Sequence, residues 1–286
     1  MTGASGFRRA GMVLPSIATL LVLAPTRAGA QDLQTLAVSR RPSGETALDV
    51  SVRYGAGRLE VTDSDAGVLY SLRLVYDPES SRSIAEYEGG KLEVGVQARS
   101  GLPGAHWKGG GELALALGRD LPIDLDVEFG AGEVDMELGG LSLSNLAVKT
   151  GASDSRVSVS SPNPVPLSRA SFEVGAASLD ARDLGNLNAE TLDVSAGVGS
   201  VTLDFGGEWQ RDAHVSLRIG MGSLDLSFPA GLGVRIKQSG FLASFEGGSL
   251  VKRGDTYYSA DWDGAEHRVW VNIDAAFGTT TVRQND

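Results

Sequence analysis

A short motif recurs along this chain at nearly constant spacing, and it leaves few architectures open. Each copy holds two or three alternating apolar residues, a small glycine-rich corner, and two or three further alternating apolar residues. One copy reads Leu125-x-Val127-x-Phe129, Gly130-Ala131-Gly132, Val134-x-Met136-x-Leu138. Alternation with period two is typical of strands that bury one face, and these segments lack the 3.6-residue spacing of helices. The chain is therefore predicted to be almost entirely β.

The spacing of the corners predicts how these strands assemble. Glycines at 130, 151, 175, 197 and 220 are separated by 21, 24, 22 and 23 residues, and similar copies lie at 50–61 and, in degenerate form, at 234–240. Such a unit buries its apolar stripe by stacking on its neighbours, and corner glycines permit positive φ and backbones about 4.8 Å apart. We predict an all-β fold, a β-solenoid of stacked 20–24-residue strand–Gly corner–strand coils with capping hairpins at both ends. An antiparallel sandwich or barrel is the competing architecture, because it also has evenly spaced strands.

Residues 1–30 resemble a secretory signal peptide. Arg8 and Arg9 precede an apolar run over 12–24, and Ala28-Gly29-Ala30 supplies small residues for cleavage. An uncleaved membrane anchor is the alternative, but a spanning helix needs about 20 apolar residues. We predict cleavage after Ala30 and an exported protein in the periplasm, at the cell surface or in the medium, without an integral membrane span.

The remainder divides at about residue 118. Residues 31–118 are predicted to begin and cap the solenoid, with a hairpin turn at Gly89-Gly90. Residues 119–286 are predicted to form the repetitive solenoid with a C-terminal cap. There, aromatic residues surround Val269-x-Val271-x-Ile273, which we expect to be the final coil. Caps are expected because open sheet edges invite pairing with other chains.

Composition excludes several function classes. Asp and Glu number 36 against 25 Lys and Arg, a net charge of −11, which disfavours nucleic acid as a partner. The absence of cysteine removes disulfides, thiolate metal sites and cysteine nucleophiles. The Gly-x-Gly corners are no dinucleotide site, because they lack the third glycine and the following helix. We predict no cofactor.

Candidate catalytic and metal-binding groups are few. His106, His214 and His267 are far apart in sequence, and no metal or nucleophile motif includes them. Six acids flank one corner and could form a surface cluster. Three interpretations are open: a solvated acidic face, a calcium site, or a pair of catalytic carboxylates of the glycosidase type. Asp261-x-Asp263-Gly264 lacks further EF-hand ligands and is read as a hairpin turn. The six acids are Asp124, Asp126, Glu128, Glu133, Asp135 and Glu137.

Trp107, beside His106 in a glycine-rich loop, is the best single candidate for a partner contact. Amphipathic aromatic residues on loops are favoured in recognition. The alternative is that Trp107 covers the flank of the solenoid. The sequence assigns no catalytic, cofactor or metal residue.

These features resemble the toast-rack family of bacterial exported domains, related to the extracytoplasmic domain of Lia-type cell-wall-stress regulators and to putative-adhesin repeat domains. The resemblance covers most of 33–286, and it implies a β-solenoid at the bacterial envelope, usually without enzymatic activity. Lia-type regulators carry transmembrane helices ahead of this domain, whereas here only a cleavable signal is predicted. The resemblance rests on Gly55-Ala56-Gly57, 87–94, 125–138, Gly151-Ala152 and 265–269.

The function predicted is a non-enzymatic, exported envelope or adhesin-like interaction module that binds an envelope protein or glycan. A regulatory domain in envelope-stress signalling is the alternative, and a polysaccharide-active enzyme is the third class. Adhesion predicts retention on cells or glycans, regulation predicts a specific membrane-protein partner, and an enzyme predicts turnover of a glycan.

Overall fold

The computed structural model describes residues 33–99 and 111–285. These residues form fifteen strands in one sheet and one short 3-10 helix, η1 (Leu184–Leu187). The strands are β1 (Gln34–Arg40), β2 (Leu48–Asp63), β3 (Tyr70–Tyr76), β4 (Ser81–Glu88), β5 (Lys91–Ala98), β6 (Glu112–Leu117), β7 (Ile123–Glu137), β8 (Leu143–Ser158), β9 (Leu167–Arg182), β10 (Ala189–Asp204), β11 (Ala213–Pro229), β12 (Gly233–Glu246), β13 (Val251–Arg253), β14 (Thr256–Tyr258) and β15 (Arg268–Asn285).

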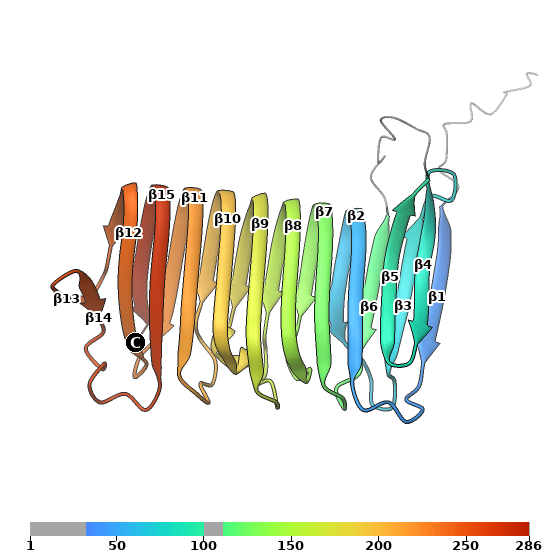
Figure 1. Ribbon diagram of the computed structural model, residues 1–286, viewed down its shortest axis with the longest axis horizontal. Helices are drawn as coiled ribbons and strands as arrows, with labels where there is room; N and C mark the ends of the chain where they lie inside the picture. Colours follow the sequence, from blue (N-terminus) through green and yellow to red (C-terminus); the bar gives the residue numbers. More distant parts are fainter. Residues whose placement is uncertain (1–32, 100–110, 286) are drawn as a thin grey trace, which may run out of the picture. The chain divides into compact units, whose positions relative to one another are not determined.

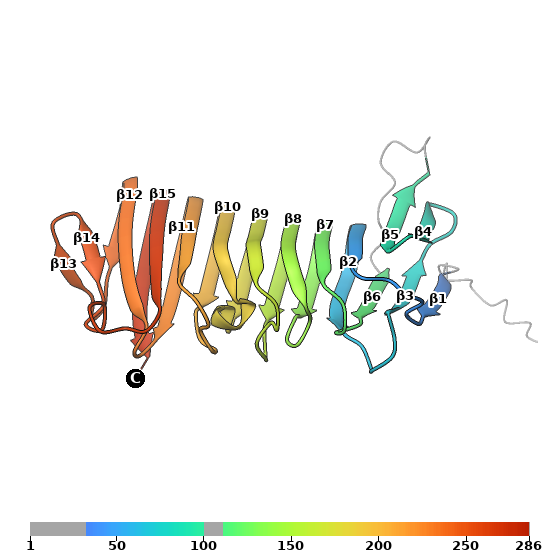
Figure 2. The ribbon, with the colours of Figure 1, turned by 60° about the horizontal axis from the view of Figure 1, so that its bottom comes forward.

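Each long strand contains one complete copy of the sequence motif. The strand runs along one side of the stack, bends at its glycine corner and returns on the other side, so that it has two arms (Figures 1 and 2). Neighbouring long strands pair in parallel, with corner beside corner. The predicted all-β, solenoid-like fold is confirmed. The stacking order of the long strands is β2, β7, β8, β9, β10, β11, β15, β12.

The core lies between the two arms. In β7, Leu125 and Val127 of the first arm and Val134 of the second are fully buried. The alternation predicted from the sequence thus continues across the corner, and both arms contribute one apolar face.

Asparagines satisfy the backbone at the end of the core opposite the corners. Asn163 is 1% exposed, accepts a hydrogen bond from the Leu143 amide (3.0 Å), and donates to the carbonyls of Leu143 (2.8 Å) and Leu187 (3.1 Å). Asn186 donates to the Val159 carbonyl (2.7 Å). Because these turns are buried, their backbone groups need such partners.

The corner glycines are required by close stacking. Gly132 has φ of 124°, and a Cβ added there would lie 2.1 Å from the Gly57 carbonyl oxygen of the next strand. A Cβ at Gly130 would lie equally close to the Gly55 carbonyl oxygen. Side chains are therefore excluded on steric grounds in addition to backbone strain.

The C-terminal strand does not end the stack, contrary to the expectation for 268–273. β15 lies between β11 and β12, parallel to both. It pairs with β11 along both arms, and Gly278 fits against Gly222 at the corner. In β12 the corner reads Phe241-Leu242-Ala243, and Gly240 lies opposite Ala275, one residue before the corner, so this copy has neither corner glycine. The copy that departs most from the motif is thus placed outermost, where only one long strand packs against it.

Short strands border both ends of the stack. β5 and β6 pair with the first and second arms of β2, and β4 forms a hairpin with β5 through Gly89-Gly90. At the other end, β14 pairs with β12 and β13. Asp261 begins a turn, with its carbonyl accepting from the amides of Gly264 and Ala265. The predicted hairpin at 261–264 is wrong, because β14 and β15 on either side of this turn pair with other strands.

Among the described residues, we find no helix with the length and apolar character needed to cross a bilayer.

Candidate functional site

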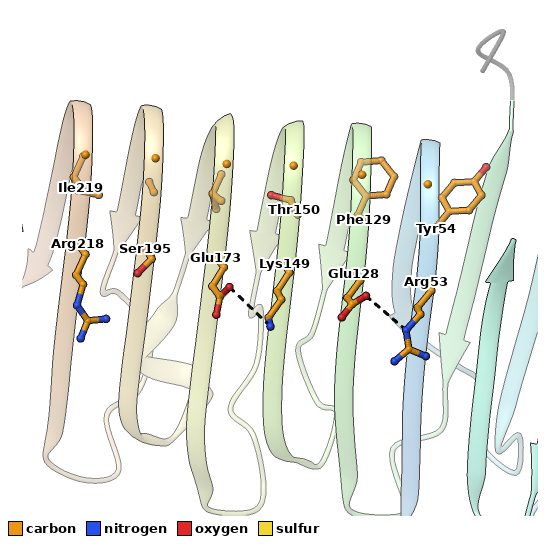
Figure 3. Close-up of a pocket in the computed structure, with 18 of the residues that line it drawn as sticks. Arg53, Tyr54, Glu128, Phe129, Lys149, Thr150, Glu173, Ser195, Arg218 and Ile219 are labelled. Carbon is orange, nitrogen blue, oxygen red and sulfur yellow. Dashed lines mark ion pairs between the residues drawn. The ribbon is translucent and has the colours of Figure 1, made fainter. Parts of the chain in front are cut away.

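The corners line up along the stack and form one continuous surface, which we call the corner face. A groove of about 1070 Å³ runs along it from β2 to β15. Figure 3 shows its lining from Arg53 on β2 to Arg218 on β11. Two register rows define this face. The charge row consists of Arg53, Glu128, Lys149, Glu173, Ser195, Arg218, Asp274 and Ser239, and the crest row consists of Ala56, Ala131, Ala152, Ala176, Val198, Met221, Phe277 and Leu242.

The floor of the groove is backbone. Gly151 and Gly175 line it, and a Cβ at either would lie within 2.7 Å of the carbonyl oxygen of the preceding corner glycine. Because side chains are excluded there, the groove stays open over several coils. A ligand that follows it would run across the strands.

Side chains of opposite charge alternate along one half of the charge row. Arg53 Nε lies 3.6 Å from Glu128 Oε2, and Lys149 Nζ lies 3.9 Å from Glu173 Oε2 (Figure 3). All four side chains are about half exposed, so each pair is worth at most about 1 kcal/mol. These pairs leave little net charge on this half of the groove.

The other half of the charge row differs. Arg218 and Asp274 are register neighbours on β11 and β15. Within residues 33–99 and 111–285, neither side chain has an ion pair or a hydrogen bond, although other surface charges are paired across coils. These two charges remain available to a partner.

The crest row changes in size along the stack. On β2 and β7–β9 it contains only alanine, whereas Val198, Met221, Phe277 and Leu242 follow on the remaining strands. Their exposures are 53%, 52%, 42% and 63%. Large apolar side chains this exposed on adjacent strands mark a surface suited to association.

The six acids around the β7 corner do not converge. Glu128 lies on the first arm with Arg53, while Asp135 lies on the second arm with Arg58 (3.0 Å) and Arg156 (3.5 Å). Glu133 also pairs with Arg58. In the part of the chain that the structure describes, no group of three or more acids and histidines is placed to hold a metal ion.

Glu137 has a different environment from a catalytic acid. Burial raises its pKa, but hydrogen bonds from Ser158 and Ser160 and from the backbone amides of Gly139 and Ser160 together lower the pKa below its usual value. A general acid of glycosidase type needs a raised pKa. Glu137 is therefore an ionised acceptor that ties neighbouring coils together.

The structure describes some of the residues singled out from the sequence and leaves the predicted partner contacts untested. His106 and Trp107 lie outside the described residues. His214 stacks on Trp270, with ring centroids 4.9 Å apart, and the His267 carbonyl accepts from the Gly233 amide. The corner face was missed as a site, although the residue between the paired glycines of β2, β7, β10 and β11 already marked part of its crest.

Comparison with known proteins gives one family. The model for the N-terminal domain of toast_rack, DUF2154, matches residues 29–181 and 165–227. No curated protein matches the chain. The matched residues include β1–β10 and all but the last two residues of β11, and therefore most of the corner face.

The solved structures that match are distant in sequence. A putative cell adhesion protein from Clostridium sporogenes is 16% identical, with a TM-score of 0.44, over 88% of this chain and 100% of that chain. A putative adhesin from Bacteroides fragilis is 11% identical, with a TM-score of 0.31, over 87% of this chain and 97% of that chain.

Proposed function

The chain belongs to the toast-rack family, and from this premise we propose that it is a non-enzymatic, adhesin-like interaction module of the bacterial envelope that binds through its corner face. The observation that carries the proposal is the exposed apolar crest at Val198, Met221 and Phe277 beside an open groove. Binding of this kind spreads over several coils, as is typical of repeat proteins.

Export is part of this proposal. We propose that residues 1–30 are a signal peptide, removed after Ala30, so that the protein acts outside the cytoplasm. His106 and Trp107 remain proposed partner contacts. The partner is an envelope protein or a glycan, because the groove offers apolar surface, backbone polar groups and paired charges to an extended chain.

Retention on envelope fractions tests the proposal. We expect the exported protein, whose intact mass should begin at Gln31, to be retained by envelope fractions from its own cells. Met221→Ser with Phe277→Ser should reduce retention by about tenfold or more, because two central apolar contacts are lost. The matched control is Val251→Ser, which changes an apolar residue of 52% exposure away from the corner face and should leave retention unchanged.

Treating the fractions with protease or with glycan-degrading enzymes separates the two partner classes. Equal retention of the double variant and Val251→Ser would contradict the assignment of the corner face. Turnover of an envelope glycan by the purified protein would contradict the non-enzymatic function.

A further inference from the structure

We propose that the corner face binds a second copy of this chain, with a two-fold axis that lies in the interface at β10, perpendicular to the direction in which the strands stack. This inference rests on the proposed function, since it assigns a second copy of the chain as the envelope protein that the same surface binds. Two corner faces would meet with their rows of strands in opposite directions. Strand spacing is about 4.8 Å in both copies, so register across the interface extends over several strands.

The crest row is complementary to itself under this symmetry. With Val198 at the axis, Met221 of one copy faces Ala176 of the other, and Phe277 faces Ala152. Each large apolar side chain thus meets a small one, because the size of the crest residues changes at the middle of the stack. The exposed apolar surface is covered without large side chains colliding.

The charge row is complementary in the same register. Ser195 lies at the axis, and Arg218 of one copy faces Glu173 of the other. One strand further out, Asp274 faces Lys149. Arg218 and Asp274, which have no ion pair or side-chain hydrogen bond in the described part of one copy, both gain a partner of opposite charge.

Other registers are disfavoured by charge. An axis between β9 and β10 would place Lys149 against Arg218 and Glu128 against Asp274. Both contacts join like charges, and the two-fold symmetry repeats each of them. An axis at β9 would place Glu173 against its own copy. Like charges across an interface suppress the wrong register, and the axis at β10 avoids both conflicts.

Complementary charge reversal tests this geometry. We expect sedimentation equilibrium to show a dimer for the chain without residues 1–30. Arg218→Glu and Glu173→Arg should each weaken the dimer by about tenfold or more, because each places like charges opposite each other at two symmetric positions. Mixing the two variants should restore dimerisation, since every facing pair in the heterodimer is again of opposite charge. Arg82→Glu, on exposed β4 and away from the corner face, is the control.

Each outcome decides the proposal. A chain that remains monomeric at about 100 μM, or a dimer that Arg218→Glu and Glu173→Arg leave unchanged, would overturn it. So would failure of the mixed variants to associate while each remains folded by circular dichroism. If the chain is monomeric but Met221→Ser with Phe277→Ser still lowers envelope retention, the proposed function stands and only the second-copy inference fails. If the chain dimerises but envelope fractions do not retain it, the second-copy inference stands and the proposed function fails.

Discussion

Gly132→Val is expected to destabilise the protein by roughly 3–5 kcal/mol, which lowers the melting temperature by on the order of 10 °C for a domain of this size. Valine is β-branched and strained at φ of 124°, and its Cβ would lie 2.1 Å from the Gly57 carbonyl oxygen. That carbonyl belongs to β2, which is paired along both arms with β7 and cannot retreat alone. Thermal and urea unfolding of the variant measure the loss.

Gly67→Val separates the collision from the backbone strain. Gly67 also has positive φ, 80°, but a Cβ there meets nothing within 4 Å. This control should cost about 1–2 kcal/mol, the strain of a side chain at positive φ alone. Equal losses for the two variants would contradict the stacking of the corners.

Asn163→Leu should have an effect of similar size for a different reason. Leucine has the same branched outline of four side-chain heavy atoms but cannot replace the three hydrogen bonds to backbone groups of Leu143 and Leu187. Each buried backbone group without a partner costs about 1–3 kcal/mol, so we expect a loss of roughly 3–6 kcal/mol in the free energy of unfolding.

The matched control for this change is Asn145→Leu. Asn145 is partly exposed, and its side chain donates one hydrogen bond to Asp124 Oδ1 (3.1 Å). Water can replace that partner, so the control should change stability by no more than about 0.5 kcal/mol. If Asn163→Leu were as mild as Asn145→Leu in urea unfolding, the asparagines would not support the buried turns.

The local repeat predicted most of the fold. The alternation of apolar residues around Gly130 and Gly132 determines which residues face the core. The glycines indicate how closely the neighbouring strands approach. The position of β15 could not be predicted, because residues 268–285 and 233–246 both resemble the motif and only packing decides which contacts β11. Stacking order depends on pairing between distant segments, to which local patterns are insensitive.

The candidate site was harder to predict than the fold. The six acids appeared as a cluster in the sequence, since strand alternation places Asp126 and Asp135 on outward faces. In the structure the corner separates the two arms, and arginines from neighbouring coils, such as Arg58 and Arg156, pair with the acids of the second arm. The spacing of the glycines already contained this register, since Asp135 and its register partner Arg156 are 21 residues apart, as are Gly130 and Gly151. Grouping the acids by their own strand alone left the arginines of the neighbouring coils out. The crest, by contrast, was readable in part: Val198 and Met221 stand between paired glycines, whereas Phe277 follows Ala276.

Labelling of single cysteines tests most directly whether the corner face is the binding surface. The chain has no cysteine, so Val198→Cys on the crest and Glu60→Cys on the exposed second arm of β2 each give one reactive thiol. We predict that maleimide labels Cys at position 198 at least about fivefold more slowly when the protein is bound to envelope fractions than when it is free and diluted until it is monomeric, because a buried thiol is inaccessible to reagent. The thiol at position 60 should react at the same rate bound and free. Equal rates at position 198 in the bound and free protein would contradict the assignment of binding to the corner face.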